Sequence, residues 1–298
     1  MFISDRIVFL ELQKTGCTHI RDLLDELVGG RLVGKHNQAS RRLFSEGRIF
    51  LGSVRDPWDW YVSLWAFGCH RKGTVFGNVT KDGIKFKGRG WRTNPLSAVH
   101  ELLQSRPNRI ADKWRRTYQD VNDPGAFREW LHMMHDKEFR PDVEGYAQSG
   151  VGQVTGFLTY SYLKTFACKK GNMDALNAIA TSDQLTDYEA SNCFIDYFVR
   201  NEHLESDLLD ALKSAGFEFS PATEAKVLSR PKTNTTSRKR KLDYYYDAPS
   251  EQLIDYWDRL VVEKFGYAVP SMREHPDEQA PIQLASGTPA RGSSLAAN

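Results

Sequence analysis

The sequence lacks any long hydrophobic run and any strong excess of charge of one sign. No apolar segment of the chain approaches the roughly 20 residues that a membrane span requires, so no span is expected. The 40 Lys and Arg residues stand against 38 Asp and Glu residues, which gives a formal charge of +2. This balance argues against a nucleic-acid partner, and any anion site has to be built locally.

Cysteine is also scarce. The four cysteines form no Cys-x-x-Cys pair, and no histidine lies near them at ligand spacing, so neither a disulfide framework nor a structural zinc site is expected. Together with the missing membrane span, this predicts a reduced, cytoplasmic protein. What the chain does have is 40% hydrophobic and 12% aromatic residues over 298 positions, enough for a large globular core.

Strand-like and helix-like segments alternate along the chain. The apolar run at residues 7–10 is followed by apolar side chains at helical spacing over residues 20–27. A second run, residues 49–54, is followed by Asp56-Pro57, a typical N-cap and first-turn pair. A third buried strand is predicted at residues 194–199, with a helix behind it. This alternation predicts an α/β fold with a parallel sheet flanked by helices.

We expect a single domain over residues 1–267, with a mostly helical insertion at residues 68–165. The insertion begins with a long segment rich in glycine, lysine and arginine, and short helical patterns follow it. Residues 253–261 carry apolar side chains at the spacing of one final helix. Residues 268–298 contain much proline, serine, glycine and alanine, so we expect them to form a disordered tail.

The stretch QKTGCT separates the first predicted strand from its helix. Such a turn presents free N–H groups and the positive end of the helix dipole at the sheet edge, where a phosphate or sulfate is favoured. Gly16 permits close approach and Lys14 supplies a charge, while Thr15 and Thr18, on either side of Gly16 and Cys17, supply hydroxyl groups. The alternative is an ordinary turn with a surface lysine and Thr18 as N-cap.

This stretch differs from the usual nucleotide phosphate-binding loop. That loop is written G-x-x-x-x-G-K-[ST], with the lysine after the second glycine. Here Lys14 precedes Gly16, and none of the five residues before Lys14 is a glycine. An ordinary ATP or GTP loop is therefore a poor match.

A second set of polar residues follows the second predicted strand. Arg55 stands at the strand end, where its planar guanidinium suits a phosphate held by the first turn. Ser63 lies two helical turns further on and is expected near the same anion. The alternatives are an ion pair of Arg55 with Asp56 or Asp59, and a plain packing role for Ser63.

These features resemble the sulfotransferases that use 3'-phosphoadenosine 5'-phosphosulfate (PAPS), in their carbohydrate-type and bacterial branch. The family's first motif is Pro-Lys-Thr-Gly followed by small and hydroxyl residues, and its second is Arg-x-Pro with a serine eight residues after the arginine. The matching residues are Lys14, Thr15, Gly16 and Thr18 in the first motif and Arg55, Pro57 and Ser63 in the second. The resemblance covers about residues 7–267, with the middle unmatched. The chain departs from the pattern at Gln13, Cys17, His19 and Trp60.

The resemblance implies a fold like that of the P-loop nucleotide hydrolases and a transfer of a sulfuryl group from PAPS. The implied acceptor is a hydroxyl or amine of a carbohydrate-like molecule, such as a glycan, or of another small molecule. The insertion at residues 68–165 is expected on the acceptor side. The implied 5'-phosphosulfate ligands are Lys14, Thr15, Gly16, Cys17 and Thr18, and the implied 3'-phosphate ligands are Arg55 and Ser63. The resemblance also implies that a basic segment near the C-terminus, here residues 237–241 with Arg238 or Arg240, folds over the nucleotide. The alternative is a solvated charge run. The chemistry requires no metal.

Several points stay open at this stage. A hydroxyl acceptor needs a general base, and His36, His19 and Glu11 are candidates, with His36 first. Competing readings are an atypical nucleotide-dependent kinase and a protein that binds the nucleotide without turnover. The oligomeric state is undetermined. The tryptophans Trp91, Trp114 and Trp130 of the insertion either form a partner surface or line an acceptor cleft.

Overall fold

The structure is a computed structural model, and it describes residues 1–81, 111–141, 143–231 and 240–273. The strands are β1 (Phe2–Ile3), β2 (Ile7–Leu10), β3 (Arg31–Leu32), β4 (Ile49–Val54) and β5 (Tyr197–Arg200). The α-helices are α1 (Cys17–Val28), α2 (Pro57–Cys69), α3 (Thr74–Val79), α5 (Ala111–Arg116), α6 (Pro124–His135), α7 (Phe157–Phe166), α8 (Met173–Asn177), α9 (Ser182–Asn192), α10 (Leu204–Ser214), α11 (Pro221–Leu228), α12 (Ala248–Trp257) and α13 (Arg259–Phe265). The 3-10 helices are η1 (Arg41–Glu46), η2 (Val151–Gln153), η3 (Asn201–His203), η4 (Leu242–Tyr244) and η5 (Pro270–Met272).

The five strands form one mixed sheet in the order β3-β1-β2-β4-β5. β4 pairs in parallel with both β2 and β5, whereas β1 is antiparallel to β2 and β3. The predicted α/β class with flanking helices is confirmed, but the prediction of a parallel sheet is wrong for β1 and β3. The connection between β1 and β2 is too short for the crossover that a parallel pair requires, so the two strands form an antiparallel hairpin.

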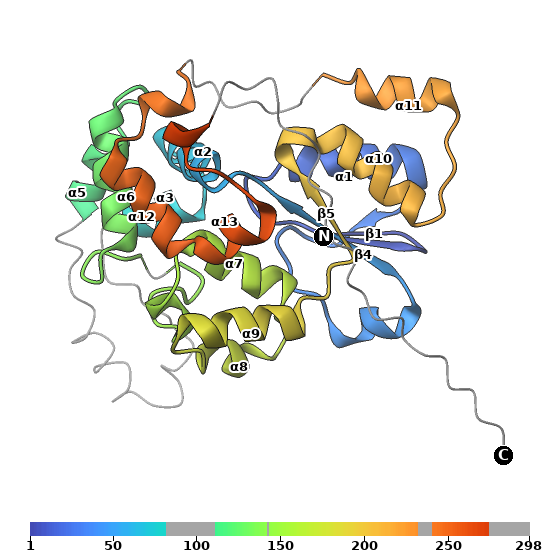
Figure 1. Cartoon of the computed structure of the whole chain (residues 1–298), viewed down its shortest axis with the longest axis horizontal. Coiled ribbons are helices and arrows are strands. Elements are labelled where there is room, and N and C mark those ends of the chain that lie inside the picture. Colours follow the sequence, from blue (N-terminus) through green and yellow to red (C-terminus); the bar gives the residue numbers. More distant parts are fainter. Residues whose placement is uncertain (82–110, 142, 232–239, 274–298) are drawn as a thin grey trace.

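Different helices cover the two faces of the sheet (Figure 1). Ile7 and Phe9 of β2 belong to the apolar cluster with α1 and α10. Val8 and Leu10, which alternate with them, belong to the larger cluster with α2, α6, α7 and α12. All four residues of β2 are buried, as expected of a strand covered on both faces. The turn that follows β2 therefore starts from a firmly packed strand.

The predicted helix start at Asp56-Pro57 is confirmed. Asp56 accepts a hydrogen bond from the N–H of Asp59, with Pro57 in the first turn of α2. Asp123 caps α6 in the same way, ahead of Pro124. Both carboxylates satisfy N–H groups that have no partner within the helix. Because its cap follows β4 at once, α2 begins at the same sheet edge as α1.

The predicted extent of two elements is wrong. β5 begins at Tyr197 rather than at residue 194, because Phe194 packs edge-on against Phe50 instead of extending the ladder. The final helix is interrupted at Asp258, which separates α12 from α13. Its buried carboxylate accepts the N–H of Thr159 on α7, an interaction with no signal in the sequence pattern.

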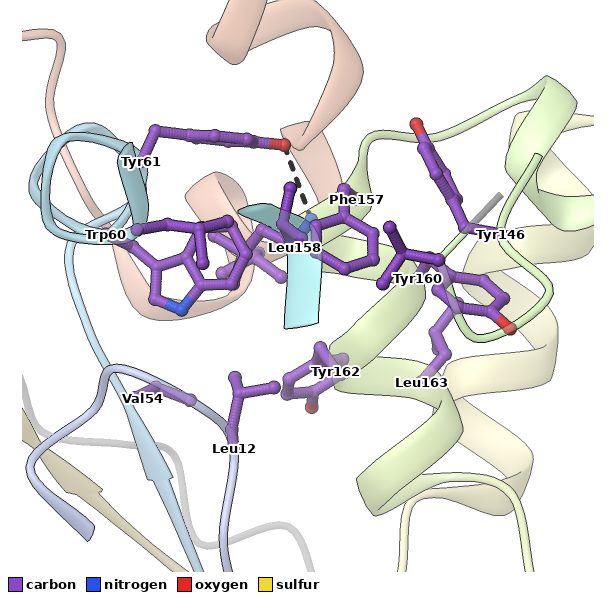
Figure 2. Packing of buried hydrophobic residues seen from close by; sticks show 14 of the residues in the cluster. Leu12, Val54, Trp60, Tyr61, Tyr146, Phe157, Leu158, Tyr160, Tyr162 and Leu163 are labelled. Carbon is purple, nitrogen blue, oxygen red and sulfur yellow. Dashed lines mark hydrogen bonds between the residues drawn. The ribbon is translucent and has the colours of Figure 1, made fainter. Parts of the chain in front are cut away.

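The helical layer between β4 and β5 extends from α2 to α9, so it is wider than the predicted insertion at residues 68–165. Figure 2 shows its core, with Trp60 and Tyr61 of α2 beside Phe157 and Leu158 of α7. The Tyr61 hydroxyl accepts the N–H of Leu158 at 3.3 Å. α2 thus belongs to the same packed body as the helices that follow it.

Two of the tryptophans considered for a partner surface are core residues. Trp114 and Trp130 are 2% and 0% exposed. Their side chains pack among the helices, which rules out the surface that the sequence left open for them. Trp91 lies outside the described residues.

The start of the expected tail is held against the domain. The hydroxyl of Ser271 donates to Glu251, and Arg273 pairs with Asp56 at 2.5 Å. Ser271 belongs to the 3-10 helix η5, and Arg273 follows that helix directly. The predicted tail boundary at residue 268 is therefore too early.

Candidate anion-binding site

The turn between β2 and α1 has the backbone of a tight loop. Lys14 and Gly16 both have positive φ values, 67° and 81°. A Cβ on Gly16 would lie 2.6 Å from Leu204 Cδ1 and 2.8 Å from Asn201 Nδ2, so only glycine fits. Gly16 is the N-cap of α1, which corrects the alternative of a Thr18 cap; Thr18 is half-buried in the first turn. The free N–H groups of that turn lie at the carboxyl edge of the sheet.

The side chains of two of the predicted ligands, Thr15 and Cys17, support the loop from inside. The Thr15 hydroxyl lies 2.6 Å from both the Leu12 carbonyl and the Ser53 hydroxyl. The Cys17 thiol donates to the same carbonyl at 2.8 Å, and burial raises its pKa. These contacts tie the loop to β4. The backbone N–H groups and the hydroxyl of Thr18 are the remaining candidate donors to an anion at the loop.

Lys14 is the cation of the site, and the structure brings it next to Arg55. The guanidinium of Arg55 donates to the Lys14 carbonyl at 3.0 Å. The Lys14 ammonium lies 4.2 Å from the centre of the Phe67 ring. Burial, and then the charge of Arg55, lower the pKa of Lys14 to about 8. The lowered pKa shows that the two positive groups repel each other, a repulsion that an anion placed between them relieves.

Arg55 also forms an ion pair with Asp59, one of the two partners that the sequence analysis considered for it. Its Nε and Nη2 lie 2.7 Å and 2.5 Å from Asp59 Oδ2. The pair does not remove Arg55 from the site, because it orients the guanidinium toward the loop. The other candidate partner, Asp56, caps α2 and pairs with Arg273; burial raises its pKa to about 6.

α2 contributes two further groups near the loop. The indole of Trp60 donates to the Gln13 carbonyl at 2.6 Å, so this departure from the family pattern fastens the loop. Ser63 is 1% exposed, and its hydroxyl has no hydrogen-bond partner among the described residues. An orphaned buried hydroxyl is costly unless another group meets it. The hydroxyl of Ser63 is therefore an unused hydrogen-bonding group on α2.

The three candidate bases have different surroundings. His36 is exposed, and its Nδ1 lies 3.0 Å from the Glu11 carbonyl at the end of β2. The Glu11 carboxylate is buried, with the amino group of Met1 at 2.5 Å and Arg21 at 3.8 Å. His19 is 2.9 Å from Glu205 and links α1 to α10. Of the three side chains, only that of His36 is exposed, and it lies beside the end of β2.

The predicted C-terminal basic ligands are not brought to the loop by any contact in the part of the chain that the structure describes. Arg238 lies outside that part. Arg240 is exposed, with its guanidinium 5.1 Å from the centre of the Tyr244 ring. The Tyr244 hydroxyl donates to the Asn122 carbonyl, so Arg240 lies near the turn before α6.

The sequence interpretation missed three residues that touch the loop. Ser53 bonds to Thr15, Phe67 contacts Lys14, and Asn201 packs against Gly16. Ser53 and Asn201 stand at the carboxyl ends of two parallel strands, which meet at one edge of a sheet, so strand position was an available signal. Phe67 had no such signal, because its contact depends on the direction of the Lys14 side chain.

Within the described ranges, no group of three His, Cys, Asp or Glu residues is placed to hold a metal ion, and no helix is long and apolar enough to cross a membrane. We compared the chain with models of protein families, with curated proteins and with solved structures. None of the three comparisons gave a match.

Proposed function

We propose that the protein is a sulfotransferase that moves a sulfuryl group from PAPS to an acceptor hydroxyl or amine. One observation carries this proposal: Arg55, from the second motif, donates to the carbonyl of Lys14, from the first. Two segments 41 residues apart in the chain therefore meet at one sheet edge, beside the N-terminus of α1. A donor with phosphates at both its 5' and 3' positions matches these two centres of positive charge.

The chemistry needs positioning and charge stabilisation more than covalent help from the protein. The acceptor oxygen attacks sulfur, and the bond from sulfur to the 5'-phosphate oxygen breaks, so that 3'-phosphoadenosine 5'-phosphate leaves. Lys14 and the N–H groups of the first turn of α1 stabilise the charge that grows on this phosphate. Arg55 and Ser63 bind the 3'-phosphate and fix the donor in place.

His36 is the proposed general base. The Glu11 carbonyl can only accept a hydrogen bond, so the proton of the neutral ring is on Nδ1 and the lone pair is on Nε2. Because the side chain is exposed, Nε2 is open to an acceptor hydroxyl and can take its proton. The acceptor is a hydroxylated, carbohydrate-like molecule in this proposal.

Calorimetric titration tests the donor site. Wild-type protein is titrated with 3'-phosphoadenosine 5'-phosphate, ADP and AMP, and the series is repeated with Arg55→Ala and Lys14→Ala. We expect the 3'-phosphate to give a strong preference, which Arg55→Ala loses by about ten- to hundredfold because a charged hydrogen bond is removed. Arg42→Ala, at a side chain 89% exposed on η1, is the matched control and should bind as wild type does.

The other outcomes separate the alternatives. Equal binding of ADP and 3'-phosphoadenosine 5'-phosphate favours the kinase and contradicts the proposal, as does no binding at all. Tight binding of PAPS without its consumption, across a panel of hydroxylated and amine acceptors, favours a protein that holds the nucleotide without transfer.

A further inference from the structure

Phe67 stands on the face of α2 that meets the loop between β2 and α1. Asp59, Ser63 and Phe67 are spaced four residues apart, so they lie on one side of the helix. Asp59 at one end of this row holds Arg55, which donates to the Lys14 carbonyl. Phe67 at the other end contacts the Lys14 ammonium. Lys14 therefore contacts Arg55 through its carbonyl and Phe67 through its ammonium.

The Phe67 ring is held in position from both sides. Lys14 Nζ lies 4.2 Å from the ring centre, within the range of a favourable cation–π contact. On the α3 side, a Cβ on Gly73 would lie 2.9 Å from Phe67 Cδ1, so the backbone there packs directly on the ring. Between the ends of the row, Ser63 is buried with no hydrogen-bond partner in the described residues.

We infer that Phe67 is a positioning residue that holds the Lys14 ammonium away from the anion until a ligand arrives. A bound 5'-phosphate draws the ammonium off the ring toward the N-terminus of α1. Phe67 thus competes with the donor for Lys14, so it lowers donor affinity. This inference rests on the proposed function for its ligand.

The resting contact is testable without any nucleotide. Lysines are dimethylated with isotope-labelled formaldehyde, which keeps their charge, and the Lys14 signal is identified by its loss in Lys14→Arg. We expect the methyl resonance to be shifted upfield by the ring current of Phe67. The shift should vanish in Phe67→Leu and persist in Phe67→Tyr, which retains the aromatic face. A Lys14 resonance without the shift in wild type overturns the inference.

The competition is tested by the sign of an affinity change. Phe67→Leu should bind 3'-phosphoadenosine 5'-phosphate about two- to fivefold more tightly, because a cation–π contact at a partly exposed site no longer opposes binding. Phe67→Tyr should bind as wild type does, and so should Phe76→Leu, a half-buried ring on α3 that contacts Tyr118. Nucleotide binding should also abolish the upfield shift in wild type.

Unchanged or weaker binding by Phe67→Leu, or an upfield shift that survives bound nucleotide, contradicts the competition. A purely structural role of Phe67 predicts lower stability and weaker binding, the opposite sign. If wild type shows the shift but binds neither PAPS nor its product, the proposed function fails; titration with inorganic pyrophosphate then decides whether an anion still displaces Lys14, and a shift that pyrophosphate leaves in place overturns the inference.

Discussion

Lys14 determines how the site responds to pH. Its pKa, lowered to about 8 by burial and by Arg55, means that the side chain is charged below this pH and becomes neutral above it. Affinity for 3'-phosphoadenosine 5'-phosphate should therefore fall as the pH rises from 7 to 9 through about 8. Lys14→Arg keeps its charge over this range and should flatten the profile in the same titration. A wild-type profile as flat as that of Lys14→Arg would contradict this account of Lys14.

Gly16 is required both for its backbone conformation and for the space beside it. Gly16→Ala should reduce the free energy of unfolding by about 2 kcal/mol or more and abolish nucleotide binding, because the new methyl group meets Leu204 and Asn201. Gly47, the C-cap of η1, is the matched control, since it has the same left-handed conformation with φ 66° and a Cβ there meets no atom within 4 Å. Gly47→Ala should cost about 1 kcal/mol for the conformation alone and bind nucleotide normally. Chemical denaturation and calorimetry measure both quantities, and equal effects would disprove the steric argument.

His36 is expected to affect the transfer rate and leave donor binding unchanged. His36→Gln removes the basic nitrogen but not the anion donors, so the rate of PAPS consumption with an active acceptor should fall about a hundredfold or more. The dissociation constant of 3'-phosphoadenosine 5'-phosphate should stay the same. The control is His132→Gln, at an exposed position on α6. A rate unaffected by His36→Gln would assign the base elsewhere.

At the scale of the element, α2 fastens the loop through one indole. Trp60 and Trp65 are both fully buried on this helix, and each donates to a carbonyl, at 2.6 Å to Gln13 and at 2.7 Å to Thr117. Trp60→Phe and Trp65→Phe should both lose stability, because each leaves a carbonyl without its donor and reduces packing, at about 1–3 kcal/mol.

Only Trp60→Phe should also weaken nucleotide binding, by about tenfold, because the loop loses one of its fixed points. Chemical denaturation and calorimetric titration of the two variants test this difference directly. If both variants bind nucleotide equally well after correction for folded protein, α2 does not control the loop through Trp60.

The elements also show what a sequence pattern can and cannot reveal. The strand-turn-helix order and the cap at Asp56 were predictable, because apolar spacing and capping residues are local signals. The two-residue strands β1 and β3 were not, since periodicity has no meaning over so short a run. At the site, the meeting of Lys14 and Arg55 followed from strand ends that share an edge, whereas the contact with Phe67 depends on side-chain direction.

At the scale of the whole molecule, a buried network joins three helical segments. The Tyr61 hydroxyl donates to Asp258 at 2.7 Å and lies 3.2 Å from His135 Nε2. Burial raises the pKa of Asp258 to about 6 and lowers that of His135 to about 4. The two groups therefore have opposite effects on stability between pH 4 and 6.

The direction of each effect on the unfolding free energy follows from proton binding in the folded and the unfolded state. The native state binds a proton at Asp258 more readily than the unfolded chain does, so this group's contribution is complete below about pH 4 and is lost as the pH rises through 6. The unfolded chain binds the proton of His135 more readily, so that contribution increases with pH from about 4 to 6.5. In the wild type the two slopes partly cancel.

Asp258→Asn removes the contribution of Asp258 to the pH dependence of the unfolding free energy. The unfolding free energy of this variant should rise between pH 4 and 6 by about 2–3 kcal/mol more than that of wild type, since one pKa unit corresponds to about 1.4 kcal/mol. Chemical denaturation at several pH values measures it. Asp255→Asn, at an exposed position on α12, should leave the pH dependence of the unfolding free energy as it is in wild type. The same pH dependence in both variants would contradict the role of the buried network.

The central claim, that the edge formed by Lys14 and Arg55 binds a donor with a 3'-phosphate, is tested most directly by a crystal structure with bound 3'-phosphoadenosine 5'-phosphate. The account predicts the 5'-phosphate on the N–H groups of the first turn of α1 and the 3'-phosphate on Arg55 and Ser63. A nucleotide bound with its phosphates reversed, or bound away from this edge, would contradict it.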